Sequence, residues 1–208
     1  MVERFLPGGV PQRVEKNTLP YGSKFLEHLA NALLGLEPPD PSLVKRFQEL
    51  LGCLMYAATS SRPDIAYPVH KLCTCLQRPT PELLAEALHV LSYLARHSDV
   101  GITYTGEPSE PDGFADASWE TRYSTSGWFI RWQGAALSWG SRKQKCIALS
   151  TCEAEIIALS EAAKDVVYLR KLVTGLGHAP ESATVLRTDS KAARDVSYNP
   201  EQHEKMKH

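Results

Sequence analysis

Apolar residues recur at helical spacing through the first half of the chain. One run predicts a helix that reaches toward Tyr56, and its members are Leu43, Phe47, Leu50, Leu51 and Leu54. Another follows Thr80, a good N-cap, and Pro81, which fits the next position; its members are Leu84, Leu88, Leu91 and Ala95. Between the two, Pro68 falls inside a third helical pattern, which we expect it to kink or to delay.

The first forty residues differ, because they are rich in proline, glycine and charge. They predict an extended, partly disordered arm over residues 1–40, with one helical patch at residues 23–36. The sequence EPPDPS at residues 37–42 is expected to end that patch. Residues 41–105 are then expected to form a mainly helical segment.

Near Val100 the helical spacing gives way to short apolar runs separated by turn residues. GITYTG predicts a strand, and the loop GEPSEPDG after it is a plausible domain boundary. FADASW, SGWFIRWQ and AALSWGSR predict three strands joined by short turns, with Gly127 and Gly134 interpreted as turn signals. A long helix from about Cys152 to Leu172, the buried strand ATVLRTD and a helix at SKAARDVS follow. This order predicts an α/β domain over residues 106–208.

Composition narrows the choice of partners. The 208 residues are 43% hydrophobic and 23% charged, with a formal net charge of −1, so any basic surface for nucleic acid must be local. The longest apolar runs are too short to span a bilayer, and the N-terminus has no apolar signal-peptide core. We therefore expect no membrane association and no secretion. The five cysteines form no CxxC pair and fit reduced thiols.

Three acidic residues carry the candidate chemistry. Asp116 in GFADASW and Asp189 in VLRTDSKAA each follow an apolar run at the end of a predicted strand, and Glu155 lies in the helix that begins STCEAE. Carboxylates that converge from such elements repel one another, so they imply a bound hard cation, most often Mg²⁺. Taken singly, Asp116 also fits a turn residue and Asp189 an N-cap.

Two neighbouring glutamates, Glu153 and Glu155, have different predicted roles. Ser150 and Glu153 fit a capping box, which gives Glu153 a structural task. Glu155 instead heads the core-facing stripe of its helix, which continues with Leu159, Ala162, Val166, Leu169 and Val173. Burial of a lone carboxylate is costly, so a basic partner or a metal must compensate. The alternative is a first-turn acid that complements the helix dipole.

Arg142, Lys143 and Lys145 in SRKQK form the strongest local basic patch. They are candidates for phosphate binding, and the alternative is a solvated turn between strand and helix. The four tryptophans alternate with polar residues along the strands, which favours packing over base stacking. His203 in the C-terminal segment is interpreted as an ordinary exposed histidine.

Residues 113–172, from GFADASW through STSGWFIRWQ, LSWGSRKQ and ALSTCEAEIIALSEAAKDVVYLRKL, resemble the ribonuclease H domain of copia-type LTR retrotransposon Pol polyproteins, as do RTDSKAA and NPEQHEKMKH. FQELLGCLMYAATSSRPDIAYPVHKL resembles the end of the reverse transcriptase and its connection to that domain. The resemblance assigns residues 41–105 to this connection and residues 106–208 to a ribonuclease H-like domain that is incomplete at its C-terminus.

The resemblance implies a ribonuclease H-like fold and a two-metal hydrolysis of the RNA strand in RNA–DNA hybrids, with Mg²⁺ or Mn²⁺. Asp116, Glu155 and Asp189 match the family's metal-binding carboxylates. The implied partners are the hybrid and the remainder of the Pol polyprotein, in a cytoplasmic virus-like particle or the nucleus.

The sequence departs from the family pattern at several places, of which the missing fourth carboxylate lowers the expected activity and the change at Ser118 is tolerable. Ser118 replaces an aspartate, Cys152 replaces a threonine, and the sequence stops before the family's fourth carboxylate. We therefore expect activity that is weak or absent. The alternative to an active enzyme is a catalytically inactive, truncated relic that binds nucleic acid weakly at most. A protein-interaction module built on the helices of residues 43–97 is a further alternative.

Overall fold

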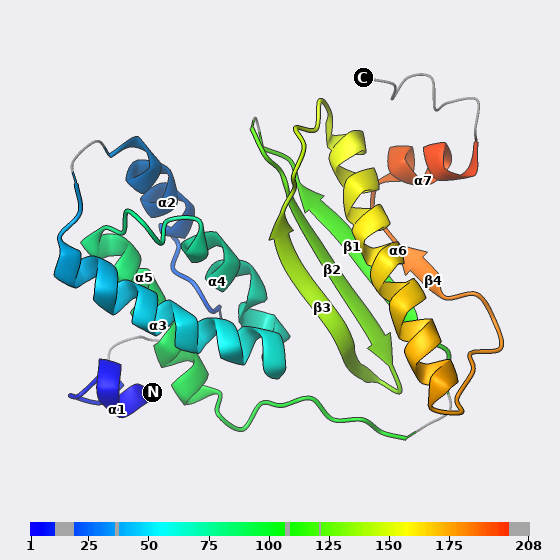
Figure 1. Cartoon of the computed structure of the whole chain (residues 1–208), viewed down its shortest axis with the longest axis horizontal. Coiled ribbons are helices and arrows are strands. Elements are labelled where there is room, and N and C mark those ends of the chain that lie inside the picture. The colour runs from blue at the N-terminus through cyan, green and yellow to red at the C-terminus, as the bar shows by residue number, and fades with distance from the viewer. Residues whose placement is uncertain (11–18, 36–37, 107–108, 121, 200–208) are drawn as a thin grey trace. The chain divides into compact units, whose positions relative to one another are not determined.

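The structure is a computed structural model that describes residues 1–10, 19–35, 38–106, 109–120 and 122–199 (Figure 1). The chain divides into two compact units, Met1–Gly101 and Ile102–His208. Among the described residues, no helix combines the length and the apolar character needed to cross a bilayer.

The first unit is helical. Its elements are α1 (Val2–Phe5), α2 (Phe25–Leu34), α3 (Pro41–Ser60), a 3₁₀ turn η1 (Pro63–Ile65), α4 (Ala66–Cys73) and α5 (Pro81–Arg96). The Thr80 hydroxyl accepts a hydrogen bond from the Leu83 amide, so the predicted N-cap of α5 is confirmed. The side chains that are almost completely buried include Phe25, Phe47, Leu50, Leu51, Leu54, Ile65, Val69, Leu72, Leu83, Val90 and Leu91.

The face of α5 that enters this core differs from the predicted stripe. Leu83, Ala87 and Val90 are fully buried, whereas Leu84 and Leu88 are only partly buried. The helix contacts α2, α3 and α4, so its buried face is wider than one stripe. Pro68 lies in the first turn of α4, where its missing amide removes no helical hydrogen bond. It therefore delays the helix rather than kinking it.

The predicted extended arm is wrong for much of the described part of residues 1–40. Phe5 of α1 and Phe25, Leu29 and Ala32 of α2 are buried in the same core as α3 and α5. The patch predicted at residues 23–36 corresponds to α2. Burial of these side chains stabilises the segment, which its proline and glycine content did not reveal.

The second unit is an α/β layer structure with the elements β1 (Asp112–Ser118), β2 (Thr125–Trp132), β3 (Ala135–Lys143), α6 (Thr151–Gly175), β4 (Val185–Arg187) and α7 (Lys191–Tyr198). The strand order is β3-β2-β1-β4. The first three strands are antiparallel, and β4 joins β1 in parallel after the crossover helix α6. This is the predicted ribonuclease H-like architecture, a mixed sheet with flanking helices.

A tight turn connects β2 to β3. Gln133 and Gly134 both have positive φ, 51° and 78°, as the favoured two-residue hairpin turns require. The strand predicted at GITYTG is not formed. Tyr104 donates from its hydroxyl to the Ala136 carbonyl, and the Thr105 amide donates to Gln133, but these bonds do not extend into a ladder. The β-propensity of this run was therefore not sufficient to predict a strand, because strand formation also depends on a ladder with a neighbouring strand.

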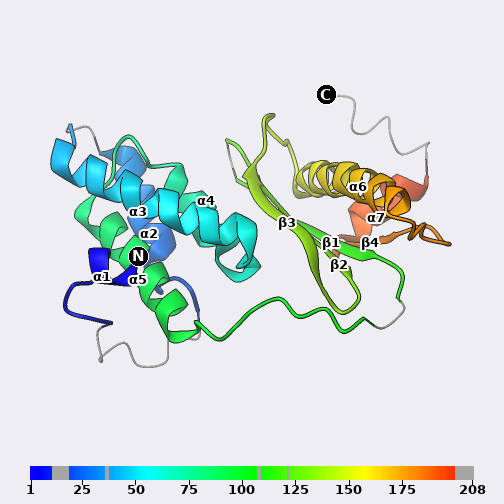
Figure 2. The same ribbon diagram turned by 60° about the horizontal axis from the view of Figure 1, so that its bottom comes forward.

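Helix α6 runs along one face of the sheet (Figures 1 and 2). Small residues let it approach β1 closely, because Ala115 packs on Ala158 and Ala162. Further along, Ile130 packs on Val166 and Leu169. The predicted core stripe of α6 is confirmed at Glu155, Ala162, Val166, Leu169 and Val173, which are all buried, while Leu159 is only partly buried. This packing fixes α6, and with it Glu155, against the end of β1.

Candidate metal centre

The site lies where one edge of β1 is open. Strand β4 pairs with β1 only along Asp112, Gly113 and Phe114. Beyond this point, among the described residues, no strand pairs with this edge of β1. The Ala117 amide donates to the Glu155 carboxylate. The short length of β4 therefore makes room for the first turn of α6 to reach the end of β1.

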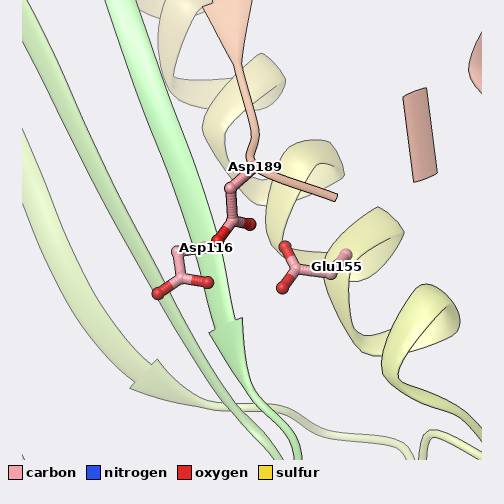
Figure 3. Close-up of side chains that lie close together, drawn as sticks. All are labelled: Asp116, Glu155 and Asp189. Atoms are coloured by element: carbon pink, nitrogen blue, oxygen red, sulfur yellow. The ribbon is translucent and has the colours of Figure 1, made fainter. Parts of the chain in front are cut away.

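Three carboxylates converge at this opening. Asp116 comes from β1, Glu155 from α6, and Asp189 from the segment between β4 and α7 (Figure 3). One oxygen from each lies within 4.8 Å of the others. The sequence analysis selected these same three residues, and the structure brings them together. Whether they bind metal and act in catalysis stays a prediction.

The electrostatics of this cluster are unfavourable without a cation. Burial raises the pKa of Glu155, which is 8% exposed, and the charges of Asp116 and Asp189 raise this pKa further, against the lowering effect of the Ala117 amide. Within the described part of the chain, none of the three forms an ion pair with lysine or arginine. Three convergent carboxylates without a basic partner fit a hard divalent cation.

The neighbouring Glu153 has the structural role expected of it. The Ser150 hydroxyl accepts from the Glu153 amide at 3.1 Å, and the Glu153 carboxylate accepts from the Leu149 amide at 2.7 Å. The donor to Glu153 is thus the residue before the cap rather than the cap itself. This pair holds the start of α6 in place and takes Glu153 out of the metal cluster.

Gln144 supports the same helix start, and the sequence analysis missed it. Its side chain is 6% exposed, and Nε2 donates to the Ser126 hydroxyl and to the Ala154 carbonyl, both at 2.9 Å. Because Ala154 precedes Glu155, Gln144 joins β2 to the turn that carries the buried carboxylate. An amide between two lysines gave no signal of burial in the sequence.

The basic residues lie at the same end of the sheet but not inside the cluster. Arg142 pairs with Ser126 and Lys143 with Thr125 on β2, and these residues pair with Ala117 and Ser118 on β1. The Arg142 guanidinium lies 5.4 Å from the Trp128 ring centre, and the Lys143 ammonium lies 4.9 Å from that of Tyr123. Lys145 is exposed in the segment that leads to α6. Phosphate binding by these three stays a prediction.

The tryptophans have several environments. Trp128 packs against α6, as predicted, and donates to Asp165 at 2.9 Å. Trp132 donates to the Ser109 carbonyl at 2.7 Å. Trp119 is 44% exposed, which differs from the predicted packing role. His203 lies outside the described residues, so its interpretation stays a prediction.

Comparisons with known proteins place the chain among mobile-element proteins. It is 35% identical over 167 residues to the "Retrovirus-related Pol polyprotein from transposon TNT 1-94" of Nicotiana tabacum, which covers 78% of this chain and 12% of that protein. It is 30% identical over 179 residues to the corresponding polyprotein "from transposon RE2" of Arabidopsis thaliana, covering 84% of this chain and 12% of that protein. The chain thus spans about an eighth of the length of these relatives.

A shorter relative is the "Secreted RxLR effector protein 161" of Plasmopara viticola, which is 36% identical over 124 residues, or 57% of this chain and 87% of that protein. No protein-family model matched the chain. The fold and the carboxylate cluster define a ribonuclease H-like domain with a candidate metal centre. The chain belongs to the family of copia-type retrotransposon Pol polyproteins, as one segment of them.

Proposed function

We propose that this chain is the ribonuclease H module of a retrotransposon polyprotein, with metal-dependent hydrolysis of the RNA strand of RNA–DNA hybrids. The observation that carries the proposal is the convergence of Asp116, Glu155 and Asp189 within 4.8 Å, where the charges of the two aspartates add to burial in raising the pKa of Glu155. A structural role alone gives no reason for three acids to meet.

Asp116, Glu155 and Asp189 would hold the divalent ions. Mg²⁺, when bound, supplies an activated water and stabilises the charge that develops on the leaving oxygen. The protein's contribution is to keep the carboxylates in place before substrate arrives. The Ala117 amide orients Glu155 from β1, and Gln144 fixes the preceding turn of α6. Such preorganisation avoids a reorganisation cost during the reaction.

Two further groups of residues would handle the substrate. Arg142, Lys143 and Lys145 would hold phosphates of the hybrid, each with a salt-sensitive contact. Glu155 is suited to accept a hydrogen bond from the ribose 2′-hydroxyl, the group that distinguishes RNA from DNA. The remainder of the polyprotein, in a cytoplasmic virus-like particle or the nucleus, is the proposed setting.

The test is cleavage of an end-labelled RNA–DNA hybrid by the full chain in Mg²⁺ and in Mn²⁺, with Asp116→Asn and Glu155→Gln. The matched control is Glu153→Gln, two residues from Glu155, because its carboxylate serves the helix cap. We expect weak cleavage by the wild-type and control proteins and its loss in the other two. Absence of cleavage by a folded wild-type protein would instead favour the inactive relic.

A further inference from the structure

Three exposed apolar side chains lie on the segments that leave β1 and lead into α6. Trp119 is 44% exposed, Ile147 is 50% exposed and Leu149 is 64% exposed. The indole Nε1 of Trp119 donates to the carbonyl of Ala148 at 3.1 Å, and Ile147 and Leu149 flank that residue on either side. We call Trp119, Ile147 and Leu149 the apolar rim. The carboxylate site described above does not use it.

Hydrogen bonds anchor the segments that carry the apolar rim. Its tryptophan follows β1 directly, and the segment that carries the other two members is fixed by the buried Ala148 and by the bond from the Leu149 amide to Glu153. The Trp119 indole N–H is already bonded to the protein. A large ring held in solvent, with its donor satisfied internally, offers a preformed apolar contact surface.

The position of Trp119 along the chain places the apolar rim near the carboxylates. Trp119 is three residues after Asp116, so a strand rise of about 3.3 Å per residue places its backbone about 10 Å from that of Asp116. A duplex strand advances about 3.4 Å along its axis per nucleotide, so the apolar rim lies within a few nucleotides of a phosphate at the carboxylates. A duplex whose phosphate lies at the carboxylates would therefore extend over the apolar rim.

The charges around the apolar rim suit a nucleic acid. Lys143 and Arg122 both lie over the Tyr123 ring, with their charged groups 4.9 and 5.6 Å from its centre, and Lys145 is exposed two residues before Ile147. Glu120, next to Trp119, accepts a hydrogen bond from the Thr125 hydroxyl. Cationic side chains beside apolar ones match a sugar–phosphate backbone, in which anionic phosphates alternate with apolar sugar faces.

We propose that the apolar rim packs against sugar rings of an RNA–DNA hybrid next to the phosphate held at the carboxylates. This inference rests on the proposed function and adds a contact that the basic residues do not provide. An A-form helix presents its sugars along a wide, shallow minor groove, which a flat rim can reach. The contact is apolar, so it strengthens binding without releasing counterions.

The experiment measures binding of a fluorescein-labelled RNA–DNA hybrid to the full chain by anisotropy, in Ca²⁺ in place of Mg²⁺, over a series of salt concentrations. Leu149→Ser is the principal variant and Ile147→Ser the second. The matched control is Leu176→Ser, because Leu176 is 69% exposed and caps the opposite end of α6. Lys143→Gln serves as the electrostatic comparison.

We expect Leu149→Ser and Ile147→Ser each to weaken binding about tenfold, as for the loss of one buried aliphatic contact, with an unchanged salt slope. Leu176→Ser should bind as the wild type does, and Lys143→Gln should reduce the salt slope by about one. Trp119→Phe keeps a ring but loses the indole bond, so it should bind better than Trp119→Ser.

The outcomes separate the two proposals. If the wild type does not bind the hybrid, both are wrong. If it binds and the rim variants bind as tightly as Leu176→Ser, the apolar rim is not a substrate contact, while the proposed function stands. If Leu149→Ser changes sedimentation of the protein rather than its hybrid affinity, the rim is an interface between copies of the chain, which also overturns the inference.

Discussion

Two buried glutamates, one in each unit, lie in opposite electrostatic environments. Glu86 of α5 is 7% exposed and Glu155 of α6 is 8% exposed. The Glu86 carboxylate accepts from His28 Nδ1 at 2.9 Å and from the Gly22 amide at 3.2 Å, so its charge ties α2 and the segment before it to α5. Glu155 faces two further carboxylates. The two carboxylates are therefore about equally buried, but Glu86 has a structural role, whereas Glu155 lies among like charges that a cation would balance.

The comparison shows how to interpret a buried acid. A carboxylate with donors around it is explained by the fold, because its desolvation is offset by hydrogen bonds and charge. A carboxylate whose pKa is raised by like charges, as that of Glu155 is despite the Ala117 donor, points instead to a cation that the protein binds.

The largest effect is expected at the metal cluster. Glu155→Gln should lower the rate of hybrid cleavage by about a hundredfold or more, the scale of removing several kcal/mol of transition-state stabilisation. It should also abolish the rise in melting temperature that Mn²⁺ gives the wild type, because the ion binds only the folded state. Calorimetry with and without Mn²⁺ measures the second effect independently of activity, and equal shifts in both proteins would contradict the metal assignment.

Removal of the other glutamate should act on stability. Glu86→Ala leaves His28 and the Gly22 amide without their acceptor, so it should lower the free energy of unfolding by about 2–3 kcal/mol. Urea unfolding followed by circular dichroism measures this change. The control is Glu49→Ala, which removes a surface ion pair with Arg4 and should cost less than about 1 kcal/mol. An equal loss of unfolding free energy in Glu86→Ala and Glu49→Ala would contradict the structural role of Glu86.

Substitution of Gln144 is expected to affect both the stability of the second unit and its metal binding. Gln144→Leu removes the bonds to Ser126 and Ala154, so it should cost about 1–2 kcal/mol. All four tryptophans lie in the second unit, so their fluorescence reports its unfolding specifically. We also expect weaker Mn²⁺ binding, because the turn before Glu155 loses its support. Unchanged Mn²⁺ affinity in a destabilised variant would limit Gln144 to a packing role.

The smallest effect concerns pH in the absence of metal. Because the folded-state pKa of Glu155 is raised, the folded protein binds this proton more tightly than the unfolded chain does. Its stability contribution is therefore present below the unfolded pKa and is lost as the pH rises through the folded value. In EDTA, Glu155→Gln should be more stable than the wild type at pH 7, and this advantage should shrink at pH 4. Urea unfolding followed by tryptophan fluorescence at both pH values measures this difference in stability. Glu155→Gln is expected to stabilise the protein at pH 7, whereas Glu86→Ala is expected to destabilise it.

Several features of the fold could be predicted from local sequence patterns. Periodicity predicted the helices and the buried stripe of α6, and the spacing of Ser150 and Glu153 predicted the helix cap, since both depend on residues within a few positions of each other. The choice of Asp116, Glu155 and Asp189 combined this periodicity with resemblance to a family.

Other features depended on contacts between distant residues. The segment 19–34 carries proline and glycine, yet it is held by α5 through Glu86 and by a shared core, which no local pattern encodes. GITYTG has the composition of a strand but lacks a ladder partner. Gln144 looks like one polar residue of a basic run until the fold buries it between β2 and α6.

The sequence by itself determined most of the helices, the strands of the second unit and the cap of α6, because short-range sterics and hydrogen bonding set them, and family resemblance added the choice of the three acids. Only the tertiary structure decided that β4 ends early enough for Glu155 to meet the end of β1, and that Trp119 is fixed at the surface by Ala148. Both depend on how far separate segments extend once they pack, and that is a property of the assembled unit rather than of any one segment.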